Sequence, residues 1–285
     1  MPDDEKWDLI IKPRVGWLDL NFGEIWRYRD LIFLFVKRDF VAQYTQTILG
    51  PVWHIVQPIL TTLVFLLVFG KIANIPTDGI HPILFYMAGI TIWNYFATSL
   101  TTVSNTFIIN ANMFGKVYFP RIIIPISVVL SNIIRFGIQF MLLVVTMIIL
   151  YFRGADIHVT FQFWIWIPAI VVIMAGFALG LGIIVSSLTA KYRDLSVLLT
   201  FAVQLYMYAT PIAYPVSYLM TKTKLTWVID LNPLAPVVEA FRYCLFGKGT
   251  FTTYDLLYSA GFVVVTVVLG FLLFNRVEKK FMDTV

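Results

Sequence analysis

Three Gly-Lys pairs are the closest approach in this sequence to a nucleotide-binding motif. They are Gly70-Lys71, Gly115-Lys116 and Gly247-Lys248. A phosphate-binding loop follows the pattern G-x-x-x-x-G-K-[ST], in which backbone amides and the lysine hold the phosphates. None of the three pairs is followed by serine or threonine. We therefore expect this chain to hydrolyse no ATP itself and to bind neither ATP nor magnesium.

Acid–base and metal chemistry have little support in the sequence. His54, His81 and His158 stand apart, without the spacing of metal ligands, and no G-x-S-x-G nucleophile elbow occurs. Glu239 and Arg242 have i,i+3 spacing, which favours a structural ion pair over a catalytic pair. The sequence predicts neither an enzyme site nor a metal site.

Phosphate binding has better candidates near the N-terminus, in Lys37, Arg38 and Tyr44. Arginine holds a phosphate in a bidentate fork, and lysine adds a compact charge. The alternatives are an anchor for anionic lipids or a salt bridge along a helix. Arg135 is a second cation that can contact an anionic substrate, but pairing with backbone or with a lipid headgroup explains it equally well.

Aromatic and hydroxyl side chains are concentrated in two apolar stretches. Hydroxyl and amide side chains fill most positions from Thr98 to Thr106, directly after a run of aromatic residues. Aromatic faces beside hydroxyl groups suit sugar rings, although an aromatic belt at the membrane surface and polar contacts between helices explain each residue singly. Our candidates for the lining of a sugar channel are Trp53, Trp93, Tyr95, Phe96, Tyr206 and Tyr208.

The composition places these residues in an integral membrane protein. Of the 285 residues, 59% are apolar and only 13% are charged, about half of the ~25% that is usual in soluble domains. The single cysteine, Cys244, excludes an intrachain disulfide. We expect one all-α transmembrane domain over residues 1–285.

Six stretches long enough to cross a bilayer, ~20 apolar residues each, are nearly free of charged residues. The predicted spans are Pro51–Gly70, Ile83–Ile109 within Gly79–Gly115, Ile122–Phe152, one inside Ile157–Ala190, one inside Leu195–Thr221, and Leu256–Asn275. The bundle thus covers residues 51–275, with a tail over 276–285.

The loops on one side of these spans carry most of the basic residues. The N-terminal segment, the 111–121 loop, the 191–194 loop and the C-terminal tail together hold 14 Lys and Arg, against six in the three opposite loops. The positive-inside rule therefore predicts that both termini are cytoplasmic. Residues 1–30 lack the apolar core of a signal peptide.

Two segments fit neither spans nor ordinary loops. Residues 24–45 read as an amphipathic helix in the membrane interface, with a polar arc that includes Arg27 and Arg38; an amphipathic helix packed on soluble protein is the alternative. Ala213–Thr253 is too apolar for a free loop and too broken by proline for a span. Short helices dipping into the outer leaflet fit this segment, with a plain extracytoplasmic loop as the alternative.

A set of short motifs in a fixed order resembles a known family, the permease subunits of type-2 ATP-binding-cassette exporters for polysaccharides and polyol phosphates. The motifs are Arg38-Asp39-Phe40, Tyr44, Leu49-Gly50-Pro51-Val52-Trp53, Gln57-Pro58, Phe119-Pro120-Arg121, Pro125, Lys191-Tyr192-Arg193-Asp194-Leu195, Thr210-Pro211-Ile212-Ala213-Tyr214-Pro215, and Asn232-Pro233 with Glu239 and Arg242. They cover most of the chain, and residues 1–23 lie outside the resemblance as a cytoplasmic extension.

The resemblance implies a homodimer joined to two copies of a separate ATPase, which would bind the ATP and magnesium. It implies an interface helix matching Glu24–Tyr44, a coupling helix matching Asn110–Arg121, and two short extracytoplasmic helices matching Val216–Phe246. Apolar anchors in a basic loop suit a cleft on a soluble partner, with membrane-surface anchoring as the alternative. The candidate coupling residues are Phe114, Lys116, Tyr118 and Phe119.

We therefore expect an exporter subunit in a bacterial cytoplasmic (inner) membrane, whose substrate is a glycan on an undecaprenyl-type lipid. O-antigen export leads within the family, followed by capsular polysaccharide and teichoic acid. Drug efflux and an enzyme acting on lipid-linked sugars are rivals from other classes. The partners expected are a second copy, the ATPase, membrane lipids and the substrate, with no nucleic acid.

Overall fold

The computed structural model describes residues 22–44, 50–114, 116–117, 119–159, 163–222, 226–249 and 252–282. Helices are the only regular structure in these parts of the chain, which contain no strand. In chain order the helices are α1 (Phe22–Arg27), α2 (Arg29–Tyr44), the 3-10 turn η1 (Gly50–Val52), α3 (Trp53–Phe65), the π-helical η2 (Leu66–Ile72), α4 (Pro82–Ser104), α5 (Thr106–Ile109), α6 (Ala111–Phe114), α7 (Ile123–Phe152), α8 (Phe163–Thr189), α9 (Leu195–Ala209), α10 (Val216–Lys222), α11 (Thr226–Asp230), α12 (Ala235–Phe246) and α13 (Thr253–Met282). The predicted all-α fold is confirmed.

Five of the six predicted spans have a helix of sufficient length and apolarity to cross a membrane. These stretches are Trp53–Ile72, Pro82–Ser104, Ile123–Phe152, Phe163–Thr189 and Thr253–Val277. They correspond to the first, second, third, fourth and sixth predictions.

The fifth predicted span is shorter than expected, and the count of six is not confirmed. Its helix α9 has 15 residues, about 22 Å at 1.5 Å per residue, whereas the hydrocarbon core is ~30 Å thick. The helix ends where Thr210 becomes extended, with φ −99° and ψ 141°. Residues that precede a proline, here Pro211, avoid the helical region because of a steric clash.

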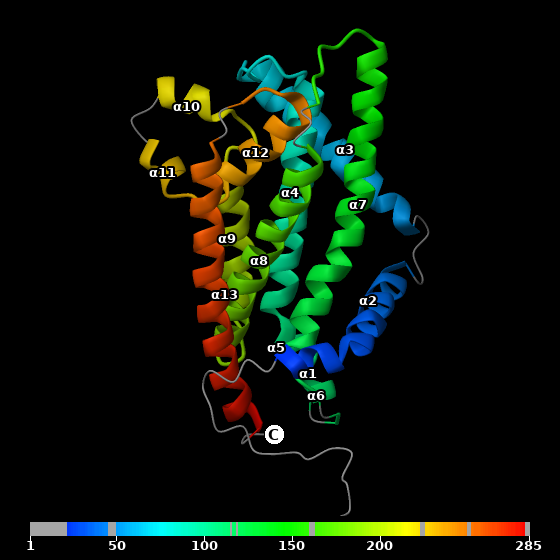
Figure 1. The fold of residues 1–285 in the computed structure, drawn as a ribbon, viewed down its shortest axis with the longest axis vertical. Helices are drawn as coiled ribbons and strands as arrows, with labels where there is room; N and C mark the ends of the chain where they lie inside the picture. The colour runs from blue at the N-terminus through cyan, green and yellow to red at the C-terminus, as the bar shows by residue number, and fades with distance from the viewer. Residues whose placement is uncertain are drawn as a thin grey trace, which may run out of the picture.

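Helix α4 is the central element of the bundle. It contacts α3, α7, α8, α9 and α12, and most of its side chains are buried. The long helices run roughly along the vertical axis of Figure 1, with α7 on one side of α4 and α9 and α13 on the other. Every polar side chain on α4 is buried or half-buried.

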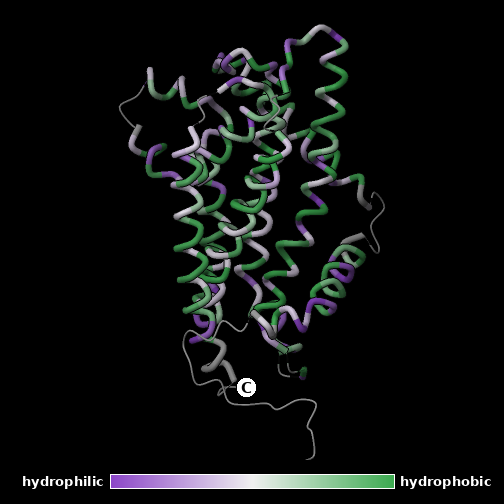
Figure 2. The backbone as a smooth tube through the Cα atoms, viewed as in Figure 1, coloured by the Kyte–Doolittle hydropathy of each residue, from purple (hydrophilic) through white to green (hydrophobic). Residues whose placement is uncertain are grey.

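Helix α2 lies beside the lower half of α7, at the end of the molecule that also holds α1, α5 and α6 (Figure 1); we call this the α2 end. Ile32 and Phe35 are buried. Phe33, the next residue in the sequence after Ile32, is 68% exposed, and Leu34 is 59% exposed. Hydrophobic and hydrophilic turns alternate along α2 (Figure 2). The expected division into one polar and one apolar face is therefore only partly met, because both the bundle side and the outer side of α2 are apolar.

Three short helices, rather than the two expected, lie between α9 and α13, at the opposite end of the molecule (Figure 1). The last of them, α12, packs against α4, α8 and α13 and is almost entirely buried. Pro236 lies in its first turn, where a missing N–H costs nothing. Gly247 ends it in the left-handed conformation, with φ 65°. Helix α12 is thus part of the packed bundle and not a free loop.

Candidate binding cleft

A cavity of about 350 Å³ opens between α2, α4 and α7 at the α2 end; we call it the α2 cavity. Helix α2 packs against α7 and has Ile32 and Phe35 buried, and Asp39 and Ala42 continue the face of Ile32 and Phe35 at helical spacing. Its polar lining comprises Arg38, Asp39, Thr102, Thr106, Asn110, Ser131, Asn132 and Arg135.

Lys37 and Arg38 are the predicted phosphate-binding residues whose side chains the structure describes. Of these two, Arg38 lines the α2 cavity. Its Nε and Nη2 donate to Asp39 Oδ1 over 2.9 and 2.8 Å, and its guanidinium lies 4.6 Å from the centre of the Phe35 ring. Lys37 is exposed and does not line the cavity. Tyr44 ends α2, and its side chain lies outside the described residues.

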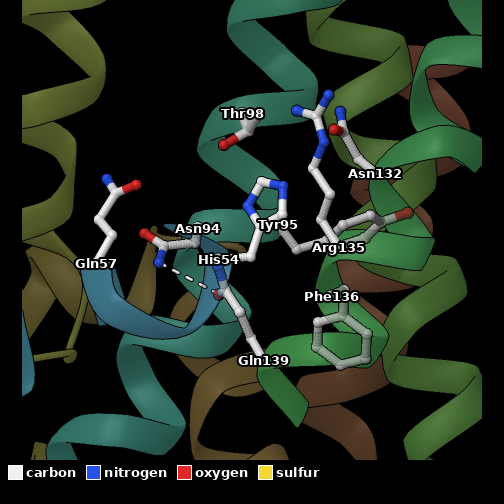
Figure 3. Close-up of a pocket in the computed structure, with 9 residues that line it drawn as sticks. All are labelled: His54, Gln57, Asn94, Tyr95, Thr98, Asn132, Arg135, Phe136 and Gln139. Carbon is white, nitrogen blue, oxygen red and sulfur yellow. Dashed lines mark hydrogen bonds between the residues drawn. The ribbon is translucent and has the colours of Figure 1, made fainter. Parts of the chain in front are cut away.

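A second, smaller cavity of about 160 Å³ adjoins the first, because Asn132 and Arg135 line both. We call it the Arg135 pocket. Its nine lining residues come from three helices (Figure 3): His54 and Gln57 from α3, Asn94, Tyr95 and Thr98 from α4, and Asn132, Arg135, Phe136 and Gln139 from α7.

Two side-chain hydrogen bonds order the walls of the Arg135 pocket. Asn94 donates to Gln139 over 3.3 Å, the dashed line in Figure 3, and Asn132 donates to the Ser99 hydroxyl over 3.1 Å. The guanidinium of Arg135 lies toward the opposite end of the pocket from the Asn94–Gln139 pair in this view. The pocket therefore presents mainly hydrogen-bond donors and amides within helices that are otherwise apolar.

Part of this wall could have been predicted from the sequence. Asn132, Arg135 and Gln139 have i, i+3 and i+7 spacing, so they share one face of α7. His54 and Gln57 share a face of α3 in the same way. Polar residues at helical spacing inside apolar spans are a readable signal, but we had considered Arg135 singly and had not joined it to Asn132 and Gln139.

The six predicted channel residues do not meet in one cavity. Trp93 and Phe96 contact Tyr206, with ring centres 6.0 and 6.3 Å apart, and the Tyr206 hydroxyl donates to Asn232 over 2.6 Å. Tyr95 instead lines the Arg135 pocket. Outside these groups, Trp53 is 50% exposed and Tyr208 is 56% exposed. Channel lining stays a prediction for all six.

The predicted coupling residues differ in exposure. Phe114 and Phe119 are each 6% exposed, and Phe119 contacts Phe35 with the ring centres 5.8 Å apart. Lys116 is exposed, and Tyr118 lies outside the described residues. The described part of 110–121 contains only the short helix α6, not one continuous coupling helix. Two of the expected apolar anchors are thus buried within the chain.

The structural ion pair predicted at Glu239 and Arg242 is present. Their side chains are 5% and 1% exposed, and Arg242 Nη1 lies 3.1 Å from Glu239 Oε1. Arg242 also donates to the carbonyls of Pro211 and Ile212 over 2.6 and 2.8 Å. The pair therefore joins α12 to the turn that follows α9.

A comparison with known protein families agrees with the order of the motifs, with the apolar helices and with the buried segment before α13. The model of the family described as ABC-2 type transporter matches residues 30–246. The chain belongs to this family. The family resemblance inferred from the motifs is confirmed, and the chain is a multi-pass membrane protein of the ABC-2 permease family.

Curated relatives of this ABC-2 permease share most of its length. Two proteins of Klebsiella pneumoniae, each named O-antigen export system permease protein RfbA, are 30% identical to it over 258 residues, which is 89% of this chain and 94% of each relative. A protein of the same name from Myxococcus xanthus is 28% identical over 221 residues, which is 77% of this chain and 81% of the relative. The family match includes the described residues that line both cavities.

Proposed function

We propose that this ABC-2 permease is the membrane subunit of an ATP-driven exporter that moves a lipid-linked polysaccharide of the O-antigen type across the cytoplasmic membrane. The observation that carries the proposal is the 30% identity to O-antigen export permeases over 94% of their length.

The cavities support a substrate with a charged, hydrogen-bonding head. Arg38 stands at the α2 end, and Arg135 lies beyond it along α7. The α2 end is the cytoplasmic end in this proposal, because the basic residues of the sequence are concentrated on that side. A phosphate-linked lipid made in the cytoplasm would then meet Arg38 first.

Energy has to come from a partner in this proposal, because the sequence contains no phosphate-binding loop motif. We assign to the exporter two copies of a separate ABC ATPase and two copies of this chain. Trp53 and Tyr208 are exposed and are available to line a path for the substrate between the two copies. The exposed Lys116 and Val117 provide the contact to the ATPase, and the buried Phe114 and Phe119 support that edge from behind.

The proposal is tested by deleting the gene in its own host and measuring surface polysaccharide together with lipid-linked polymer inside the cell. Loss of the surface polymer with accumulation of the lipid-linked form is expected, and a plasmid copy should restore export. A matched strain carries the restored permease with an ATPase partner lacking its phosphate-binding lysine, and it should behave like the deletion. Normal surface polysaccharide without internal accumulation would overturn the proposal.

A further inference from the structure

One exposed side of α9 carries a line of polar side chains. Thr200, Gln204 and Tyr208 follow one another at four-residue spacing, and all three are exposed. Residues at this spacing lie on one ridge of a helix, about 6 Å apart along its axis. At 100° per residue the three occupy an arc of about 80°. We call them the polar edge of α9.

The rest of the exposed surface of α9 is apolar. Leu198, Phe201 and Leu205 are 64%, 63% and 55% exposed and occupy the neighbouring arc of the helix; we call them the apolar edge. Helix α9 contacts α4 and α8, and Val203, opposite the apolar edge, is buried. Val197, in the first turn, is the one apolar residue within the arc of the polar edge. The exposed surface of α9 thus has two edges of different chemistry.

Gln204 is the residue of the polar edge that fits worst against lipid. Thr200 donates to the Ser196 carbonyl over 3.0 Å, whereas Gln204 makes no hydrogen bond within the described part of the chain. Gln204 lies near the middle of α9, which packs against the spans α4 and α8. An amide without a partner is costly at the depth of the hydrocarbon core. The polar edge therefore has to face water or a polar partner.

The side chains of the polar edge favour a sugar over another helix as that partner. Helices in membranes associate mainly through small residues, because these let the two backbones approach closely, and glutamine and tyrosine are large. Hydroxyl, amide and phenol groups each donate and accept hydrogen bonds, as the hydroxyl groups of a sugar do. Helix α9 contains no charged residue, so nothing in it selects an ion.

We propose that the polar edge of α9 is a wall of a water-filled path along which the glycan of the exported polysaccharide moves, and that the apolar edge faces away from this path. The inference rests on the export function proposed above. It adds Thr200 and Gln204 to Tyr208 as residues that contact the glycan. The Gln204 amide then exchanges its hydrogen bonds between water and sugar hydroxyls as the polymer passes.

The first experiment measures hydration and needs no polysaccharide. Full-length permease in membrane vesicles from its host carries Gln204→Cys or Thr200→Cys and is treated with a charged, membrane-impermeant methanethiosulfonate reagent. The matched controls are Leu205→Cys and Leu198→Cys, at similar depth on the apolar edge, and the buried Cys244 of the original chain gives the background. The polar-edge cysteines should react at least about tenfold faster, because the reagent needs water and a thiolate. Equal rates on both edges, or a disulfide between two copies through Gln204→Cys in place of labelling, would overturn the proposal.

The second experiment measures surface polysaccharide per folded permease. Gln204→Leu and Thr200→Val should each reduce export about two- to tenfold, the range of one hydrogen bond, while Gln204→Asn keeps the amide and should export more than Gln204→Leu. Leu205→Ala is the control and should change export less than twofold. Normal export by both Gln204→Leu and Thr200→Val would overturn the inference even if the edge is hydrated. Absence of export by the original chain would instead overturn the proposed function, and the labelling distinguishes the two failures because it does not depend on the polysaccharide.

Discussion

The guanidinium of Arg242 in α12 lies 3.7 Å from the centre of the Phe85 ring in α4. One turn further along α4, Gly89 leaves the space that this arginine needs, because a Cβ there would come within 2.9 Å of Arg242 Nη2. Arg242 thus contacts the central helix through an aromatic face, and it contacts the Pro211–Ile212 turn through two carbonyls. A single charged side chain holds α12 in place against two other parts of the bundle.

Removing Glu239, the carboxylate partner of Arg242, should therefore lower the free energy of unfolding. Glu239→Gln leaves the Arg242 charge buried without its anion, and loss of one member of a buried ion pair costs about 3–5 kcal/mol of unfolding free energy. The double change Glu239→Gln with Arg242→Met should recover part of that loss, because it removes the buried charge as well. Unfolding in mixed micelles measures both. Asp230→Asn, on the exposed end of α11, is the control and should have little effect.

Close packing of α8 against α13 gives the second prediction. A Cβ on Gly180 would lie 2.8 Å from the Val267 nitrogen and 2.9 Å from the Thr266 carbonyl carbon, which are backbone atoms that cannot rotate away. Gly180→Ala should lower the unfolding free energy by about 1–3 kcal/mol, the usual cost of overpacking. Gly137→Ala in α7 meets nothing within 4 Å and should be neutral or stabilising, by up to about 1 kcal/mol. Equal effects of the two changes would contradict the close contact.

Span positions could be predicted from the sequence because the apolar runs are long and uninterrupted. The third span was predicted over Ile122–Phe152 and is found over Ile123–Phe152. The short α9 was predictable only in part: Thr210-Pro211 was read as a family motif, and its effect as a helix stop was not used. The ion pair of Glu239 and Arg242 followed from i,i+3 spacing alone, since that contact lies within one helix.

Cavities and burial were harder to predict, because they depend on which helices meet. Hydropathy could not show that Phe114 and Phe119 turn inward, since an exposed anchor and a buried contact have the same sequence. Nor could it show that Tyr95 and Phe96, adjacent in the chain, line different parts of the bundle. The Arg135 pocket brings residues of three helices together, and pairing between helices is not visible in the spacing along any one of them.

The third prediction separates residues of the 110–121 segment that stabilise the fold from residues that contact the ATPase. Phe114→Ala should destabilise the permease by about 3–5 kcal/mol, the usual cost of truncating a buried phenylalanine. Lys116→Glu with Val117→Asp changes exposed residues, so folding should be unaffected while the ATPase co-purifies less well. Thermal unfolding and co-purification are measured on the same samples. If the Lys116 and Val117 double variant retains the ATPase fully, these two residues are not part of the contact with the ATPase.

The fourth prediction concerns the proposed path between copies. Phe96 is fully buried and stacks on Phe177 with ring centres 5.4 Å apart, so Phe96→Ala should lower the yield of folded protein, at a cost of about 3–5 kcal/mol. Tyr208 is 56% exposed, and Tyr208→Ala should leave the yield unchanged and reduce export. Surface polysaccharide per folded permease is the measurement. Unchanged export by Tyr208→Ala would exclude this residue from the path.

The last prediction concerns Arg38, which lines the α2 cavity, and Lys37, which does not. The two cations are neighbours in the sequence and have nearly the same distance to the first span, so a general attraction to anionic lipids would use both, at ~1 kcal/mol each. A specific phosphate contact would use Arg38 alone, because only its fork faces the cavity. Arg38→Gln should therefore abolish the stimulation of ATP hydrolysis by the lipid-linked glycan in the assembled transporter, with basal hydrolysis unchanged, and Lys37→Gln should leave both rates near their original values. Asp39→Asn is the further control, since it releases Arg38 from its carboxylate and should strengthen or preserve stimulation. If Lys37→Gln and Arg38→Gln reduce stimulation equally, these cations are membrane anchors and the head of the substrate binds elsewhere.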